Sequence, residues 1–238
     1  MTYNQSEFDI RLEWGLRGVE ELAPISDVII IVDVLSYSTC VDIAVSRGAY
    51  IYPYKYKDET SIEYSKAIGA KLASMNRTAS EGYSLSPVSL LNITSGTKLV
   101  LPSPNGATLS LSTGNVITIC GGPRNAKAVA EYAMSVGNKI AVIPAGERWK
   151  NDGTLRPAFE DFTGAGTIIS YLKGNFSPEA KSAKDAFLAI SDLNNEIKKC
   201  SSGKELIEWG FESDVELAAQ LNVSAAVPIL KENAFYSA

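Results

Sequence analysis

The densest group of chemically useful side chains lies between Gly146 and Gly166. This segment holds two arginines, four carboxylates and four glycines within 21 residues. It follows an apolar run at 139–144, which is typical of a buried strand. In α/β proteins, ligands bind in the loops that follow parallel strands. Arginine suits an anionic group and clustered carboxylates suit a hard cation such as Mg²⁺, so the segment predicts a site for an anionic ligand and a metal ion.

Five side chains of this segment are candidates for the chemistry. Glu147 and Arg148 come directly after the predicted strand, and Arg156 precedes a predicted helix. Glu160 and Asp161 are neighbours on that helix, about 100° apart around its axis, so we expect only one of them to face the site. The alternative for Glu147 and Arg148 is a surface ion pair, and the alternative for the two helical acids is stabilisation of the helix dipole.

Three other strand-end loops carry polar side chains that could join this site. Asp33 ends an aliphatic run, where a carboxylate needs a compensating partner or a cation. The Ser-Pro-Asn-Gly turn at 103–106 could direct backbone N–H groups toward an anion, and Arg124 follows a further strand at 115–120. The alternatives are a helix-capping role for Asp33 and a plain turn at 103–106. Because parallel strands share one carboxyl edge, we expect the polar side chains of four loops to converge on one crevice. They are Asp33, Asn105, Arg124, Glu147 and Arg148.

The residue types exclude several kinds of catalysis. The chain has no histidine, which removes the Ser-His-Asp triad and the commonest transition-metal ligand. Cys120 and Arg124 are four positions apart, too close for the thiolate loop of a cysteine phosphatase, so we expect Cys120 to be a buried strand residue. Asp33 has no second aspartate two positions later, and the chain has no Walker-type loop. The chemistry must then rest on carboxylates, arginines, hydroxyls and a metal ion.

Composition predicts one α/β domain over residues 1–238. Hydrophobic residues make up 45% and charged residues 21% of the chain, as in ordinary globular proteins. The net charge of −5 argues against nucleic acid as a partner, and no apolar run reaches the roughly 18 residues that span a bilayer. A polar N-terminus and three widely spaced cysteines indicate a cytoplasmic location. The number of subunits stays open, a homo-oligomer included.

The elements that must position these side chains follow an α/β order. Residues 28–32 form a continuous aliphatic run, the pattern of a parallel strand buried on both faces. Ser38 or Thr39 is expected to cap a helix that ends near Arg47, before a strand at 49–54. A second strand–helix–strand unit follows, so the fold class is α/β with a mostly parallel sheet, and two similar internal halves are an open alternative. Further helices are expected at 157–172, 179–199, 204–210 and 214–221.

Several segments resemble the 2-phosphosulfolactate phosphatase family, the ComB-like proteins. They are Asp33 to Thr39, Ser103 to Gly106, Arg124 to Ala126, Gly146 to Gly166, and two C-terminal segments at 202–206 and 210–215. The resemblance implies a three-layer α/β/α fold and Mg²⁺-dependent hydrolysis of a small anionic phosphoester. The family's substrate is 2-phosphosulfolactate, on the route to coenzyme M.

On this resemblance the candidate residues take three roles. The catalytic set is Asp33, Glu147, Arg148 and Arg156. The substrate-binding set is Ser36, Ser38, Ser103, Asn105, Gly106 and Arg124. The metal set, which would hold Mg²⁺ directly or through water and supply the base, is Asp33, Glu147, Glu160 and Asp161.

One departure from the family pattern concerns Ser36. Relatives commonly carry an arginine at this position, so the loop lacks one cation for an acid group of the substrate. We therefore expect a phosphoester less anionic than phosphosulfolactate to be preferred. The same loss motivates a second hypothesis, a non-catalytic anion-binding or sensor protein on this fold. A ligase or transferase that uses the same pocket is a third.

Overall fold

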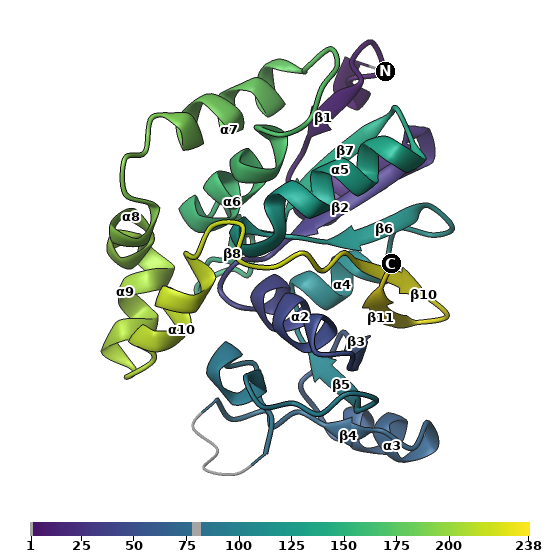
Figure 1. Cartoon of the computed structure of the whole chain (residues 1–238), viewed down its shortest axis with the longest axis vertical. Coiled ribbons are helices and arrows are strands. Elements are labelled where there is room, and N and C mark those ends of the chain that lie inside the picture. The colour runs from purple at the N-terminus through teal and green to yellow at the C-terminus, as the bar shows by residue number, and fades with distance from the viewer. Residues whose placement is uncertain (1, 78–81) are drawn as a thin grey trace.

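A nine-stranded sheet forms the centre of the fold (Figure 1). The computed structural model describes residues 2–77 and 82–238, and its strands lie in the order β1-β7-β2-β6-β10-β11-β3-β5-β4. The strands of this sheet are β1 (Ile10–Leu12), β2 (Val28–Val32), β3 (Tyr50–Tyr54), β4 (Lys71–Leu72), β5 (Lys98–Pro102), β6 (Ile117–Cys120), β7 (Ile140–Pro144), β10 (Pro228–Lys231) and β11 (Ala234–Ser237). A separate antiparallel hairpin consists of β8 (Glu147–Arg148) and β9 (Leu155–Arg156). The α/β fold with a mostly parallel sheet is therefore confirmed.

Two parallel blocks make up this sheet. β1, β7, β2 and β6 pair in parallel, and so do β3, β5 and β4. The hairpin β10–β11 joins the blocks by antiparallel pairs on both of its sides, so the blocks run in opposite directions. Their strand ends nevertheless meet, because Gly106 after β5 donates its backbone N–H to Asp33 Oδ2 after β2 at 2.8 Å. The crevice expected along one carboxyl edge is instead formed between the two blocks.

The central strand β2 shows why both faces of the sheet are covered. Its five aliphatic side chains are all fully buried. Val28, Ile30 and Val32 pack among residues of the helices α5, α6 and α7. Ile29 and Ile31, which point to the opposite face, pack with α1 and α4. Because burial of each such side chain contributes about 1.5–3 kcal/mol, the continuous aliphatic run requires helices on both faces.

Ten α-helices surround the sheet in the described part of the chain. They are α1 (Gly15–Leu22), α2 (Tyr37–Ser46), α3 (Thr60–Ala67), α4 (Gly106–Ser110), α5 (Ala126–Val136), α6 (Phe159–Ile169), α7 (Pro178–Leu188), α8 (Leu193–Lys199), α9 (Ser201–Glu208) and α10 (Glu212–Ala218). Short 3₁₀ turns lie at Thr2–Asn4, Ala23–Ile25, Pro87–Leu90 and Pro123–Asn125. Figure 1 shows α8, α9 and α10 gathered in one cluster beside the sheet.

The start of α2 differs from the sequence-based prediction. The helix begins at Tyr37, so Ser38 and Thr39 already lie in its first turn. Their hydroxyls donate to the carbonyl oxygens of Asp33 and Val34, both at 2.8 Å. The expectation that Ser38 or Thr39 caps this helix is wrong, because these hydroxyls satisfy carbonyl groups of the preceding loop instead.

Two later helix boundaries also differ. α6 begins at Phe159 rather than Pro157, because Ala158 is still extended, with φ −111° and ψ 126°. The stretch 179–199 is divided into α7 and α8. Asp192 ends the break between them by accepting a backbone N–H at the start of α8.

The two strand–helix–strand units do not repeat each other in the sheet. β2 and β3, which α2 connects, are separated by β6, β10 and β11. β6 and β7, which α5 connects, are separated only by β2. The strand order therefore gives no support to two similar internal halves. One sheet that includes strands from both ends of the chain supports the single domain over residues 1–238, which stays a proposal.

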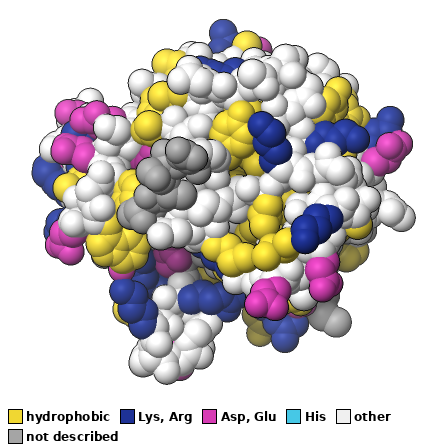
Figure 2. Space-filling view, turned by 90° about the horizontal axis from the view of Figure 1, so that it is seen from below, with side chains coloured by type: hydrophobic (Ala, Val, Ile, Leu, Met, Phe, Trp, Pro, Cys, Tyr) yellow, Lys and Arg dark blue, Asp and Glu magenta, His cyan; other side chains and the backbone are white. Residues whose placement is uncertain are grey.

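The outer surface adds two observations. In the described residues, no helix has both the length and the apolar character needed to cross a bilayer. On the face shown in Figure 2, lysine and arginine side chains are scattered among acidic and neutral ones. That face presents no continuous basic surface of the kind that a nucleic-acid backbone selects.

Candidate active site

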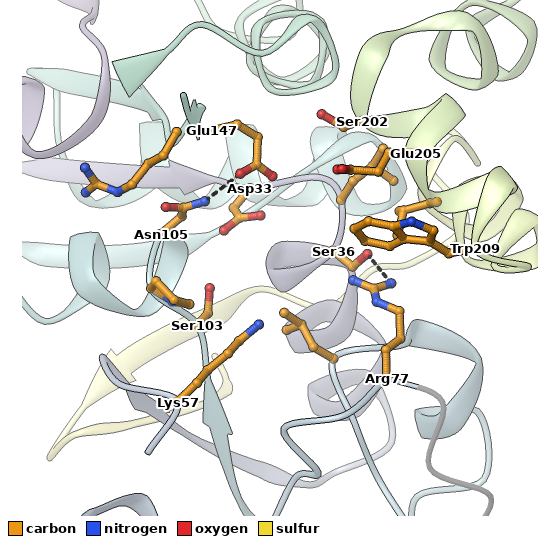
Figure 3. A pocket seen from close by; sticks show the side chains of 15 residues that line it. Asp33, Ser36, Lys57, Arg77, Ser103, Asn105, Glu147, Ser202, Glu205 and Trp209 are labelled. Carbon is orange, nitrogen blue, oxygen red and sulfur yellow. Dashed lines mark hydrogen bonds between the residues drawn. The ribbon is translucent and has the colours of Figure 1, made fainter. Parts of the chain in front are cut away.

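A cavity of about 300 Å³ lies where the strand-end loops meet (Figure 3). Ligand pockets in proteins commonly have volumes of about 300–1,000 Å³, so the cavity suits a small molecule. It is lined by Asp33, Leu35, Ser36, Lys57, Arg77, Leu85, Ser103, Pro104, Asn105, Glu147, Arg148, Ser202, Glu205, Leu206 and Trp209. The site residues predicted from the sequence that line it are Asp33, Ser36, Ser103, Asn105, Glu147 and Arg148.

Asp33 lies directly after β2 and is 7% exposed. Its Oδ2 accepts the backbone N–H of Gly106 at 2.8 Å, and its Oδ1 accepts that of Tyr37 at 3.4 Å. Burial raises the pKa of Asp33 to about 6 against the effect of these two donors, and the charge of Glu160 also raises it. A Cβ at position 106 would lie 2.2 Å from a ring carbon of Tyr37. Gly106 therefore serves the site by letting the main chain approach and orient Asp33.

Glu147 lies close to Asp33 in the cavity (Figure 3). Its Oε2 accepts a hydrogen bond from Nδ2 of Asn105 at 3.1 Å. Burial raises the pKa of Glu147 to about 7, and the charges of Asp33 and Glu160 raise it further. Arg156 and the Asn105 bond act in the opposite direction. We call Asp33 and Glu147 the acidic wall of the cavity, and its raised pKa values indicate negative charge that the surrounding protein does not fully balance.

Glu160 stands behind the acidic wall rather than in it. The side chain is 2% exposed, and its Oε2 accepts a hydrogen bond from the Cys200 thiol at 3.2 Å. It does not line the cavity, but its charge acts on both Asp33 and Glu147. Glu160 is therefore the helical acid on the side of the site.

Asp161 joins two strand-end loops. Its Oδ1 accepts the backbone N–H of Val34 at 2.7 Å, and its Oδ2 accepts that of Gly146 at 2.8 Å. The first loop follows β2 and the second follows β7. Asp161 is 3% exposed and does not line the cavity, and both its oxygens bind the main chain on the other side of these loops, so the metal-ligand role predicted for it does not agree with its position.

The β8–β9 hairpin carries both predicted catalytic arginines. Arg148 lines the cavity, and its Nη1 donates to the carbonyl oxygen of Gly153 at 2.9 Å. Arg156 does not line the cavity. Its guanidinium lies 5.9 Å from the centre of the Trp149 ring, and its Nη2 lies 3.3 Å from Ser202 Oγ. The charge of Arg156 still favours the ionised form of the neighbouring carboxylate in the acidic wall.

Lys57 and Arg77, which the sequence reasoning missed, form a basic wall opposite the acidic wall. Figure 3 shows both side chains extending into the cavity from the side away from Glu147. Arg77 Nη1 donates to Ser36 Oγ at 3.1 Å and pairs with Asp214 Oδ2 at 2.9 Å. Lys57 follows the end of β3, so the strand-end argument could have found it. Arg77 follows the two-residue strand β4, which has no recognisable sequence pattern.

Helix α9 provides the third side of the cavity. Its residues Ser202, Glu205 and Leu206 line the space together with Trp209, which follows the helix. Glu205 pairs with Lys150 of the β8–β9 hairpin at 2.7 Å. The resemblance pointed to residues 202–206, but residue types alone did not mark any of them as part of a site.

Two residues predicted to bind substrate lie elsewhere. Ser38 is 1% exposed, and its hydroxyl bonds to both the backbone N–H and the carbonyl oxygen of Asp33. Arg124 Nε donates to Asp42 Oδ2 at 2.8 Å, and its Nη1 donates to the carbonyl oxygen of Leu217 at 3.0 Å. The anion-binding roles predicted for Ser38 and Arg124 do not agree with these positions. The hydroxyl of Ser38 is used by the main chain, and the buried guanidinium of Arg124 connects α2 to α10 instead of facing the cavity.

The acidic wall fits a hard cation in one particular way. Among residues 2–77 and 82–238, no three acidic, cysteine or histidine side chains form a ready-made metal cluster. Mg²⁺, however, is commonly held by one or two carboxylates, with water and substrate phosphate as its other ligands. Asp33 and Glu147 are carboxylates of this type. Burial raises both of their pKa values, so a nearby positive charge would stabilise their ionised forms.

The cysteines take no part in the cavity wall. Cys40, Cys120 and Cys200 are all free thiols. Cys120 is fully buried within β6, and burial raises its pKa. This placement agrees with a strand residue in the core and leaves no access for a substrate to its sulfur.

Comparison with known proteins gives a consistent result along the chain. The family described as 2-phosphosulpholactate phosphatase matches residues 18–233. A probable 2-phosphosulfolactate phosphatase from Carboxydothermus hydrogenoformans is 33% identical over 223 residues, which cover 90% of this chain and 88% of the relative.

Two further relatives have the same description without the word "probable". The 2-phosphosulfolactate phosphatase of Methanothermobacter thermautotrophicus is 28% identical, with 87% of this chain and 88% of the relative covered. That of Methanocaldococcus jannaschii is 29% identical, with 87% and 90% covered. The similarity therefore extends over nearly the whole length of both partners.

Proposed function

Since the chain belongs to the 2-phosphosulfolactate phosphatase family, we propose that it is a Mg²⁺-dependent phosphatase of a small phosphorylated hydroxy acid. The substrate is 2-phosphosulfolactate or a related phosphoester. In this reaction the oxygen of water bonds to phosphorus, the bond from phosphorus to the ester oxygen breaks, and the released hydroxy acid takes up a proton.

The observation that carries this proposal is the pair of carboxylates in the acidic wall. Asp33 and Glu147 come from different strand ends, lie in one cavity and have raised pKa values of about 6 and 7. Opposite them stand the cations Lys57 and Arg77. A small cavity with these two carboxylates on one side and these two cations opposite suits an anionic substrate that is hydrolysed at one end and held at the other.

Glu147 is the carboxylate we assign as the acceptor of the proton from water. Both oxygens of Asp33 already accept backbone N–H groups, from Gly106 and Tyr37. Glu147 accepts only the bond from Asn105, through Oε2, within the described residues. Its other oxygen is therefore the better placed to accept a proton from a water molecule in the cavity.

Arg148 and Arg156 supply positive charge on the side of the hairpin. Arg148 lines the cavity, and the carbonyl oxygen of Gly153 holds one end of its guanidinium. Arg156 lies behind Glu147 and supports its ionised form. Charges held in this way offset the negative charge that develops on the phosphoryl oxygens.

Mg²⁺, when bound, would place a further positive charge next to the phosphoryl group. Asp33 is the carboxylate that would hold it, and Glu147, which lines the same cavity, would act directly or through bound water. Glu160 does not line the cavity and would contribute through its charge. Asn105 and Gly106 keep the two carboxylates in place through their hydrogen bonds.

The test is phosphate release from a panel of small phosphoesters, with Mg²⁺ and with EDTA. We expect turnover that requires Mg²⁺ and that falls by about 10²–10³-fold in Asp33→Asn. Asp185→Asn, an exposed change on α7, is the matched control and should retain full activity. Binding of the phosphoesters without turnover would support the alternative, a sensor protein, and would refute the phosphatase.

Two further points stay proposals. The three free thiols support a reducing compartment such as the cytoplasm. A homo-oligomer is also a proposal, and gel filtration with light scattering would test it.

A further inference from the structure

The basic wall, Lys57 and Arg77, carries more positive charge than the neighbouring acidic side chains balance. Arg77 is neutralised by Asp214, at 2.9 Å, and its guanidinium lies 5.4 Å from the centre of the Phe211 ring. Lys57 has no salt bridge or hydrogen bond within residues 2–77 and 82–238. Its ammonium group nevertheless lines the cavity, together with Arg77. A cation that faces a cavity beside a second cation is a position that an anionic ligand would stabilise.

Arg77 is held in one orientation by several elements. Asp214, which is 1% exposed, also accepts hydrogen bonds from Ser86 Oγ at 2.7 Å and from the backbone N–H of Val88 at 3.1 Å. The nitrogen of Arg77 that binds Asp214, Nη1, also donates to Ser36 Oγ at 3.1 Å. The guanidinium therefore does not need to be ordered when a ligand arrives, which lowers the cost of binding.

The contact between Arg77 and Ser36 changes the meaning of position 36. The sequence suggested that this loop lacks a cation, because a serine stands where relatives commonly carry an arginine. In the folded chain, a guanidinium reaches that serine from 41 residues further along the sequence. Position 36 therefore has a cation beside it, which removes one reason for expecting a less anionic substrate.

We propose that Lys57, with Arg77 beside it, binds the non-reacting acid group of the substrate, a carboxylate or a sulfonate. This inference rests on the proposed function, because it places the phosphoryl group at the acidic wall and the second acid group at the basic wall. Lys57 contacts the acid group directly. Arg77 adds a positive charge next to Ser36. Its planar guanidinium can donate a further hydrogen bond to the acid group that Lys57 contacts.

The charges around Lys57 agree with this role. Partial burial and the charge of Arg77 both lower the pKa of Lys57, whereas Asp33 and Glu147 raise it. A bound acid group would add one more negative charge near Lys57 and favour its ammonium form.

The experiment compares three phosphoesters that differ in one group. Phosphoglycolate carries a carboxylate, 2-(phosphonooxy)ethanesulfonate carries a sulfonate, and phosphoglycolamide carries neither. For Lys57→Met we expect KM to rise about ten- to a hundredfold on the two acids and less than about threefold on the amide, with kcat little changed. If the rise occurs with one acid only, that acid is the group Lys57 binds.

Arg77 requires two variants, because its removal leaves the buried carboxylate of Asp214 without its ion-pair partner. Arg77→Lys keeps the positive charge, so it should raise KM for the two acid-bearing substrates less than Arg77→Gln does. A melting curve for each variant shows whether it is folded. If Arg77→Gln does not fold, Lys57→Met alone still tests the inference, since the side chain of Lys57 makes no hydrogen bond or salt bridge within the described residues. Lys127→Met, an exposed lysine on α5, is the matched control and should leave all three substrates unchanged.

Two outcomes would overturn this inference. An equal loss of kcat/KM on all three substrates in Lys57→Met would mean that Lys57 acts on the phosphoryl group. Unchanged KM values on both acids would mean that Lys57 contacts no acid group. If wild-type protein hydrolyses none of the three, none of them is a substrate, the phosphoester panel described above still decides the proposed function, and calorimetry with glycolate and 2-hydroxyethanesulfonate decides the binding role of Lys57 alone. Tenfold weaker binding in Lys57→Met would support it, and equal binding would refute it.

Discussion

The two walls of the cavity are built in different ways. The acidic wall lies at strand ends, and its carboxylates are oriented by short bonds to neighbouring groups, such as those of Asp33 to Gly106 and Glu147 to Asn105. The basic wall consists of two long side chains from loops. Within residues 2–77 and 82–238, Arg77 is anchored at Asp214 and the side chain of Lys57 has no such partner. In the proposed function, the residues assigned to the phosphoryl group need a fixed position, whereas those assigned to the rest of the substrate can change without disturbing the sheet.

This difference suggests how relatives could vary in substrate. An arginine in the loop after β2 and an arginine from the loop after β4 can serve the same part of the cavity, as the contact of Arg77 with Ser36 shows. Substitution at position 36 therefore need not remove the charge. The acidic wall has no such alternative source, because Asp33 depends on the close approach of Gly106.

The largest effect should come from breaking the acidic wall. Glu147→Gln removes the proposed proton acceptor and should lower kcat/KM by about 10²–10⁴-fold on every phosphoester, with or without a second acid group. Steady-state phosphate release measures this. Glu131→Gln, an exposed change on α5, is the matched control. If Glu147→Gln lowered activity only on substrates with a second acid group, the acidic and basic walls would not have separate functions.

A stability effect should separate Arg124 from the cations of the basic wall. Arg124→Gln leaves Asp42 buried without its ion-pair partner, so we expect the free energy of unfolding to fall by about 3–5 kcal/mol. Urea denaturation gives this value, and KM of the folded protein should be unchanged. Arg17→Gln, which breaks an exposed pair with Glu20, should change stability little. A rise in KM with Arg124→Gln would restore Arg124 to the substrate site.

Asp161 tests whether the support behind the acidic wall is structural. Asparagine has only one terminal oxygen, so Asp161→Asn leaves the N–H of Val34 or Gly146 without its acceptor. The loss should lower stability by about 1–3 kcal/mol, while the Mg²⁺ concentration for half-maximal activity stays within about twofold. Asp192→Asn at the start of α8 is the control, because asparagine caps a helix as well as aspartate does. A large shift in Mg²⁺ requirement would instead identify Asp161 as a metal ligand.

The smallest effect concerns pH in the absence of metal. The pKa of Glu147 is raised from 4.5 to about 7 in the folded state, so the folded form binds this proton more tightly than the unfolded form. Its contribution to stability is fully present below pH 4.5 and is lost as the pH rises through 7. Glu147→Gln should therefore be more stable than wild type by about 1–2 kcal/mol at pH 8 in EDTA, with little difference below pH 4.5.

Melting temperatures in EDTA at several pH values measure this difference. Mg²⁺ should reduce it at pH 8 by stabilising the ionised carboxylates of the wild type. A wild type that is more stable than Glu147→Gln at pH 8 in EDTA would contradict the raised pKa. It would also remove the argument that the acidic wall holds unbalanced charge.

Local pattern was sufficient to place the acidic wall. The aliphatic run of β2 predicted a strand buried on both faces, and Asp33 stands where that run ends. Asn105 and Glu147 were located in the same way, from the ends of β5 and β7. These predictions hold because hydrophobic runs and the turns that end them are set by neighbouring residues. Burial of the strand on both faces follows from the same short-range pattern, whereas the three-layer order was implied by the family resemblance.

Only the tertiary structure decided which charges meet. Arg124 has its carboxylate partner 82 positions away and Arg77 has its partner 137 positions away, so no local pattern distinguishes the first, which supports the core, from the second, which lines the cavity. The reversed direction of the second strand block was equally hidden, because it depends on where the C-terminal hairpin inserts. A buried charge takes the partner that the packed chain brings within reach, and that choice depends on the whole fold rather than on sequence spacing.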